Sequence, residues 1–72
     1  MKKLDLHGVK HQNASSMADT FIRQNKANLP VEIITGNSID MQNIIKKVVS
    51  RYRLKMEPKS YFNLGSYIIR DN

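Results

Sequence analysis

The sequence predicts an α/β fold: a two-layer α+β sandwich in the order βαβαββ, in which a four-stranded mixed sheet carries both helices on one face. Three observations predict it. Four short segments alternate apolar and polar residues or are rich in β-branched residues, which is typical of strands. Two amphipathic stripes at helical spacing separate the first three segments. Connections between parallel strands are almost always right-handed, so two connections that move the same way place both helices on one face.

The first strand is predicted in the stretch 3–8. Leucines alternate there with polar residues, so the leucines face one side of the strand while Asp5 and His7 face the other. Gly8 ends the strand. This places an Asp, a His and a Gly together at a strand end, a combination that chemistry can use.

A helix is predicted from Lys10 to Asn28. Its apolar line runs through Ala14, Met17, Ala18, Phe21 and Ile22, and continues to Asn25 and Leu29. Three polar residues are candidates for its N-cap, namely His11, Gln12 and Asn13. Pro30 ends the helix, because its ring disfavours helical backbone in the preceding residue.

The next strand and helix follow directly. Residues 31–35 are β-branched and nearly all apolar, which suits a central strand, and Gly36 ends it. Asn37 or Ser38 can then cap a second helix. Its apolar stripe is continuous and consists of Met41, Ile44, Ile45, Val48, Val49 and Tyr52.

The C-terminal part predicts a hairpin. Residues 54–59 alternate at period two, and Pro58 cannot donate to a ladder, so this strand belongs at a sheet edge. Residues 61–64 are expected to form the turn, and Gly65 leads into a last strand over residues 66–70 that pairs back.

Size and composition limit the protein class. The chain has 72 residues, which predicts a single domain over 1–72. It has no cysteine, which excludes a disulfide framework and a thiolate metal cluster and favours a reducing, cytoplasmic setting. No apolar run approaches the roughly 20 residues that span a bilayer, so no membrane partner is expected. The oligomeric state is not predicted.

Net charge favours a polyanionic partner. The chain carries 12 Lys plus Arg against 6 Asp plus Glu, a formal net charge of +6. Such an excess raises affinity for nucleic acid through counterion release, although solubility alone also explains it. The densest basic run, which comprises Lys46, Lys47, Arg51, Arg53 and Lys55, either complements the dipole of the second helix or tracks a nucleic-acid backbone.

The predicted topology brings the polar turns together. Parallel strands end at the same sheet edge, so His7-Gly8 and Thr35-Gly36 are expected side by side, with Lys10, His11 and Lys59 nearby. Both helices also begin there, and free amides reached through glycine turns can hold phosphate. Asp5 can orient His7 or ligate a hard cation such as Mg²⁺, whereas a structural histidine remains the plain alternative.

Two motifs add a family resemblance. Leu4-Asp5-Leu6-His7-Gly8 and Ile33-Ile34-Thr35-Gly36 resemble the LDLHG and TGxG motifs of the Smr (small MutS-related) domain, and residues 63–69 look like its closing glycine turn and last strand. The resemblance covers essentially the whole chain, as a minimal form without flanking extensions. It implies a fold like the C-terminal domain of translation initiation factor 3, with the last strand antiparallel.

The resemblance also implies an activity. Smr domains bind nucleic acid and nick or cleave DNA or RNA, often with Mg²⁺ or Mn²⁺ and with no organic cofactor. By matching position, it implies catalytic roles for Asp5, His7 and Thr35. The residues expected to bind nucleic acid or phosphate are those of the surrounding turns: Gly8, Lys10, His11, Gly36, Asn37, Ser38, Lys59, Asn63 and Gly65.

One departure keeps three functions open. Ser38 stands where the motif has its last glycine, which limits how closely the backbone can approach a phosphate, and Asn37 takes the variable position. The chain is therefore expected to be an Smr-type endonuclease, a nucleic-acid-binding module without catalysis, or a protein interaction domain, alone or beside a larger protein. Tyr61, Phe62 and Tyr67 can stack on bases, or can simply pack in the core or lie on the surface.

Overall fold

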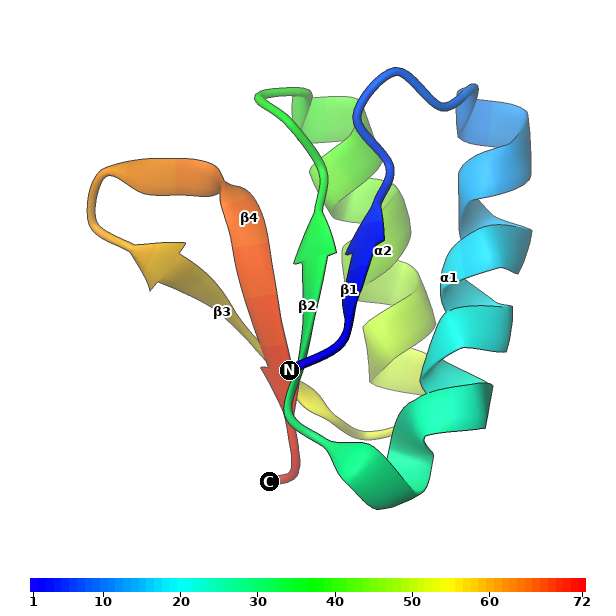
Figure 1. The fold of residues 1–72 in the computed structure, drawn as a ribbon. Helices are drawn as coiled ribbons and strands as arrows, with labels where there is room; N and C mark the ends of the chain where they lie inside the picture. Colours follow the sequence, from blue (N-terminus) through cyan, green and yellow to red (C-terminus); the bar gives the residue numbers. More distant parts are fainter.

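The computed structural model describes residues 1–72 and confirms the predicted order of elements. They are β1 (Lys3–Asp5), α1 (His11–Asn25), the 3₁₀ helix η1 (Lys26–Asn28), β2 (Val31–Ile34), α2 (Ile39–Arg51), β3 (Lys55–Ser60) and β4 (Asn63–Arg70). Both helices cover one face of a single sheet (Figure 1). The fold is therefore the two-layer α/β sandwich that the periodicities predict.

The sheet is mixed and has the strand order β1-β2-β4-β3. β1 pairs with β2 in parallel, and β4 runs antiparallel to both β2 and β3. It follows that β3 runs in the same direction as β1 and β2. The C-terminal ends of these three strands therefore point to the same side of the molecule, as expected for the βα turns.

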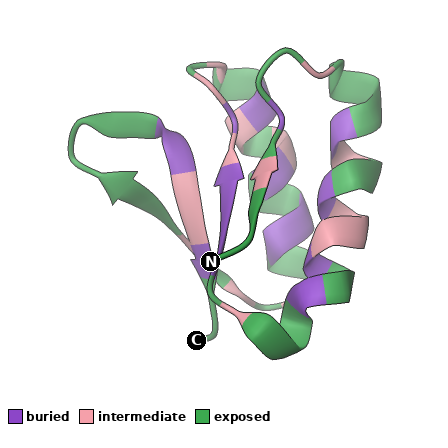
Figure 2. Cartoon of the chain, viewed as in Figure 1, coloured by how far each residue is buried: buried purple, intermediate pink, exposed green.

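The core lies between the helices and the sheet, where Figure 2 shows the buried residues in purple. Eleven apolar side chains form it: Leu6, Ala14, Ala18, Ile22, Val31, Ile33, Met41, Ile45, Val48, Val49 and Ile69. The helical stripes supply most of them at the predicted spacing. Tyr52 directly follows α2, and its hydroxyl donates a hydrogen bond of 2.7 Å to Asp19 Oδ1 of α1. This bond raises the pKa of the Tyr52 phenol.

The helix ends differ in how far the sequence predicts them. Ser38 caps α2, because its Oγ accepts a hydrogen bond from the Met41 amide at 3.1 Å. The predicted caps of α1 are wrong. The helix begins at His11 behind Lys10, which makes no side-chain cap, so the three predicted candidates lie inside the first turn. At the other end α1 stops at Asn25, three residues before the predicted end, and the chain continues as the 3₁₀ helix η1. It becomes extended at Leu29, before Pro30, as predicted.

The hairpin is longer than predicted. β4 begins at Asn63 instead of residue 66, because the two strands continue to pair beyond the rest of the sheet, with a register shift between Pro58 and Ser60. Only Tyr61 and Phe62 remain in the turn, and both are exposed, at 94% and 98%. Pro58 lies on the edge strand β3, as its missing amide requires.

Neither helix of the fold combines the length and the apolar character that a membrane crossing needs.

Candidate functional site

The histidine turn after β1 and the glycine turn after β2 lie against each other. The Leu6 amide donates to the Ile34 carbonyl at 2.8 Å, which continues the parallel ladder past the end of β1. A β-carbon built on Gly36 would lie only 3.5 Å from Cδ2 of His7. His7 is exposed and Gly36 is half-buried, so the pair faces outward. We call residues 7–10, residues 35–38 and Gly65 the rim.

Asp5 holds the histidine turn through the main chain. Its Oδ1 accepts a hydrogen bond from the backbone amide of His7 at 2.9 Å. This is an Asx-type turn, in which a short carboxylate replaces a backbone acceptor. Asp5 therefore positions His7 by fixing its backbone, whereas the sequence predicted a direct relation to the imidazole.

Thr35 lies beneath the rim. Thr35 is only 3% exposed. Its hydroxyl lies 2.8 Å from the Gly36 carbonyl and 3.3 Å from the Gly65 carbonyl. A hydroxyl committed to main-chain acceptors at this depth stabilises the turn. We therefore assign Thr35 a positioning role in place of the catalytic role that its motif implies.

Gly65 closes the rim from the hairpin side. Its carbonyl accepts from the amides of Thr35 at 2.8 Å and Gly36 at 3.0 Å, so β4 is bonded directly to the glycine turn. Gly8 and Gly36 have φ values of 81° and 69°. Both lie in the left-handed region that favours glycine, which explains why these two turns contain it.

The start of α2 supplies free donors beside the rim. The amides of Asn37, Ser38, Ile39 and Asp40 donate to no acceptor within the chain. These are the unpaired groups that any helix N-terminus leaves, together with the positive end of the helix dipole. Asn37 and Ser38 thus contribute backbone donors to the rim, while the Ser38 hydroxyl oxygen is occupied by its own cap.

The sequence and the structure match no protein-family model, no curated protein and no solved structure. The Smr resemblance therefore depends on the two turn motifs and the closing glycine turn alone. The two motifs are joined in the structure by the hydrogen bond from the Leu6 amide to the Ile34 carbonyl.

Of the other four predicted residues, Lys10 belongs to the rim, His11 directly follows it, and two belong to the hairpin. Lys10 and His11 are exposed at the start of α1, next to the histidine turn. Lys59 instead reaches across the helix-free face of the sheet, where its Nζ lies 3.3 Å from Glu32 Oε2. Asn63 belongs to the hairpin, where its Oδ1 accepts from the Gly65 amide at 3.2 Å.

Glu32 is a residue that sequence reasoning missed. It lies in the middle of β2 on the helix-free face, yet it is only 3% exposed. Ser66 donates a short hydrogen bond to it, and Lys59 adds an ion pair. The Ser66 bond first, and then Lys59, hold the pKa of this carboxyl below its usual value, although burial acts in the opposite direction. A polar network thus partly covers the helix-free face of the sheet. The only sequence signal for it was one acidic residue in an otherwise apolar strand.

Gln42 is a second missed residue. Its Nε2 donates to the Leu64 carbonyl at 3.0 Å and lies 3.5 Å from the Gly36 carbonyl. One side chain of α2 thereby ties the glycine turn to the hairpin. The sequence signal was weak, namely a polar residue one helical turn after the cap.

The rim offers few ligands for a divalent cation. No group of three or more His, Asp or Glu side chains gathers in the structure. Asp5 offers one carboxylate that already accepts from His7, and Asp40 is exposed in the first turn of α2. Mg²⁺ favours octahedral oxygen coordination, usually from one or two carboxylates with substrate phosphates and water. The residues of this chain therefore do not build a metal site by themselves.

Proposed function

We propose that the chain is a small Smr-type endonuclease that binds DNA or RNA at the rim and cleaves a phosphodiester there. The observation that carries this proposal is the closeness of the His7 ring to Gly36, where a β-carbon built on the glycine would lie 3.5 Å from Cδ2 of His7. A proton-transferring side chain thus lies beside a glycine turn and a helix N-terminus. A phosphate seated on that turn would meet both.

Charge and donors support the binding step. The net charge of +6 attracts a polyanion without regard to sequence. Lys10 and His11 are exposed and follow His7 by three and four residues, and the unpaired amides at the start of α2 are suited to phosphate oxygens. The rim therefore combines general attraction with directed hydrogen bonds.

The same groups can support cleavage. When an oxygen nucleophile attacks phosphorus, the bond from phosphorus to the leaving oxygen breaks, and a proton moves from the nucleophile to the leaving oxygen. His7 is the side chain placed to accept or deliver that proton. The unpaired amides stabilise the added negative charge on the phosphoryl oxygens. Asp5 keeps His7 in place through its backbone amide.

A binding module without catalysis is the second candidate. It is favoured by Ser38, whose side chain occupies the position of the last motif glycine and keeps the backbone farther from a phosphate. This candidate uses the same rim and predicts salt-sensitive binding without cleavage.

The deciding experiment incubates the protein with plasmid DNA and with structured RNA, with and without Mg²⁺ or Mn²⁺. We expect cleavage that falls by about 10²- to 10⁴-fold in His7→Ala. His11→Ala separates binding from chemistry. It should weaken the binding of nucleic acid but leave the cleavage rate unchanged once the protein is saturated with substrate. Cleavage that is equal in wild type and His7→Ala would refute the endonuclease proposal. Binding without cleavage would select the second candidate, and binding that is indifferent to salt would refute both.

A further inference from the structure

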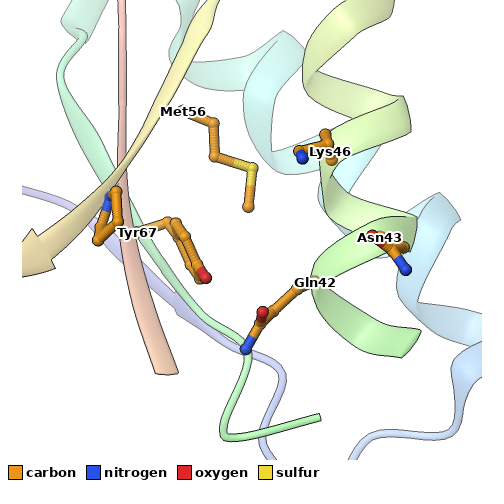
Figure 3. A pocket seen from close by; sticks show the side chains of 6 residues that line it. Gln42, Asn43, Lys46, Met56 and Tyr67 are labelled. Atoms are coloured by element: carbon orange, nitrogen blue, oxygen red, sulfur yellow. The ribbon is translucent and has the colours of Figure 1, made fainter. Parts of the chain in front are cut away.

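A pocket of about 250 Å³ lies between α2 and the β3–β4 hairpin, next to the rim. Six residues line it: Gln42, Asn43, Lys46, Met56, Pro58 and Tyr67 (Figure 3). By register, Met56 and Pro58 of the edge strand face the helical layer, opposite the residues of α2 that line the pocket.

The two walls of the pocket differ in chemistry. One wall is apolar and comes from the strands, with Met56, Pro58 and the ring of Tyr67. The other is polar and comes from α2, where Gln42, Asn43 and Lys46 lie on one side of the helix. Figure 3 shows Met56, Gln42 and Tyr67 extending toward a common space. An apolar surface opposite a few hydrogen-bonding groups is what a small polar ring system requires.

Several of these groups have no partner within the chain. The Tyr67 hydroxyl, the Asn43 amide and the Lys46 ammonium take part in none of the side-chain hydrogen bonds or ion pairs of the structure. A hydroxyl and an amide can both donate to and accept from the edge of a ring, and an ammonium can meet a phosphate. The pocket is smaller than the roughly 300–1,000 Å³ of sites for drug-sized ligands, so its volume suits a single ring system.

The pocket and the rim share a wall. Gln42 lines the pocket, and its Nε2 also donates to the Leu64 carbonyl and lies 3.5 Å from the Gly36 carbonyl. The Gln42 side chain therefore lies between a group bound in the pocket and a phosphate bound at Gly36. Lys46 lies one helical turn farther along α2 and extends the positive charge away from the rim.

On these grounds we infer that the pocket binds an unpaired nucleobase of the nucleic acid whose phosphate occupies the rim. The inference rests on the proposed function and adds a preference: the substrate is single-stranded or carries an unpaired base. A base within a duplex is stacked and paired, and moving it into a pocket costs a few kcal/mol. Single-stranded substrates do not carry that cost.

Two binding measurements test the inference. In the first, the neutral nucleosides adenosine and uridine are added while side-chain NMR signals of the protein are recorded. We expect the signals of Tyr67 and of the Met56 methyl group to shift with a common dissociation constant. In the second, a short single-stranded oligonucleotide and its duplex are compared, and we expect the single strand to bind more tightly.

Substitutions then assign the pocket. Asn43→Ala and Tyr67→Phe each remove one hydrogen-bonding group without disturbing the core, and each should weaken single-strand binding by about three- to tenfold. Lys46→Gln should weaken it more than Lys47→Gln, the matched control that removes the same charge from the neighbouring exposed residue. Duplex binding should change little in Asn43→Ala and Tyr67→Phe.

The outcomes separate the two proposals. If oligonucleotides bind but the pocket variants match wild type and nucleosides shift no pocket signal, the inference is wrong while the rim proposal stands. If nucleosides shift the pocket signals but no polynucleotide binds, the rim proposal fails and the pocket stands as a nucleoside site. Shifts produced only by a poly-glutamate peptide would overturn the inference in favour of a protein ligand.

Discussion

Gly65 lies so close to Gly36 that a β-carbon built on it would come within 3.1 Å of the Gly36 carbonyl carbon and 3.2 Å of its oxygen. The same two residues are joined by the hydrogen bond from the Gly36 amide to the Gly65 carbonyl. Gly65 therefore allows two backbones to pack closely. The glycine turn of the rim is held from outside its own βα unit, by the hairpin.

Replacing Gly65 by alanine should damage the rim. Gly36 has little freedom to move, because its amide is bonded to Gly65 and its φ is left-handed. Gly65→Ala should lower the free energy of unfolding by about 1–3 kcal/mol, measured by urea denaturation. Gly8→Asn is the control, since no atom lies within 4 Å of a β-carbon there and asparagine tolerates positive φ. Unchanged stability in Gly65→Ala would contradict the close packing.

The stabilising effect of the Ser38 cap can be measured separately from the effect of lacking the motif glycine at this position. Ser38→Ala removes the acceptor of the Met41 amide and should lower the free energy of unfolding by about 1 kcal/mol, whereas Ser38→Gly should cost only about a few tenths. Ser50→Ala on the same helix, where the hydroxyl bonds back to the Lys46 carbonyl, should be nearly neutral. Thermal melts compare the three variants. Equal effects at positions 38 and 50 would show that the cap contributes nothing.

Asp5 can be tested as a positioning residue. Asp5→Asn retains an oxygen that accepts from the His7 amide, but Asp5→Ala does not. If the carboxylate acts only by holding the turn, Asp5→Asn should keep most of the nucleic-acid binding and cleavage, and Asp5→Ala should lose both. Cleavage assays on the two variants give the answer. Equal loss of activity in both would show that the negative charge itself is needed.

The Glu32 network predicts how stability depends on pH. The pKa of Glu32 in the folded chain lies below its usual value of 4.5, so the folded state favours the ionised form. This stabilisation is complete above pH 4.5 and is lost as the pH falls through the folded pKa. Urea midpoints should therefore decline on acidification, and Glu32→Gln should decline less from a lower starting value. Glu57→Gln, which breaks only the exposed pair with Arg70, should behave like wild type. An identical decline in Glu32→Gln would contradict this role.

The parts of the fold that local patterns determine were predictable. Periodicity located both helices and all four strands, and Pro58 identified the edge strand. The cap of α2 was narrowed to Asn37 or Ser38, of which Ser38 is the cap. The adjacency of the His7 and Gly36 turns was also predictable, because parallel strands end at the same edge of a sheet.

The parts that depend on register between distant segments were not predictable. The burial of Glu32 requires Ser66 of the neighbouring strand β4 and Lys59 of β3, one strand farther, to lie on the same face of the sheet. That arrangement follows only from the pairing of β2 with β4 and of β4 with β3. Gln42 reaches Leu64 and Gly36 only once the hairpin extends past the sheet, with β4 starting at Asn63. Local sequence patterns carry no information on contacts between segments that are distant in the chain.

The central claim is that the two turns form one phosphate site, and a backbone amide NMR titration with a short single-stranded oligonucleotide tests it most directly. We predict that the amides of Gly8, Gly36 and Ile39 shift together with a single dissociation constant, and that His7→Ala weakens binding. Shifts confined to the basic run from Lys46 to Lys55 or to the hairpin tip, with the rim amides unmoved, would contradict the account.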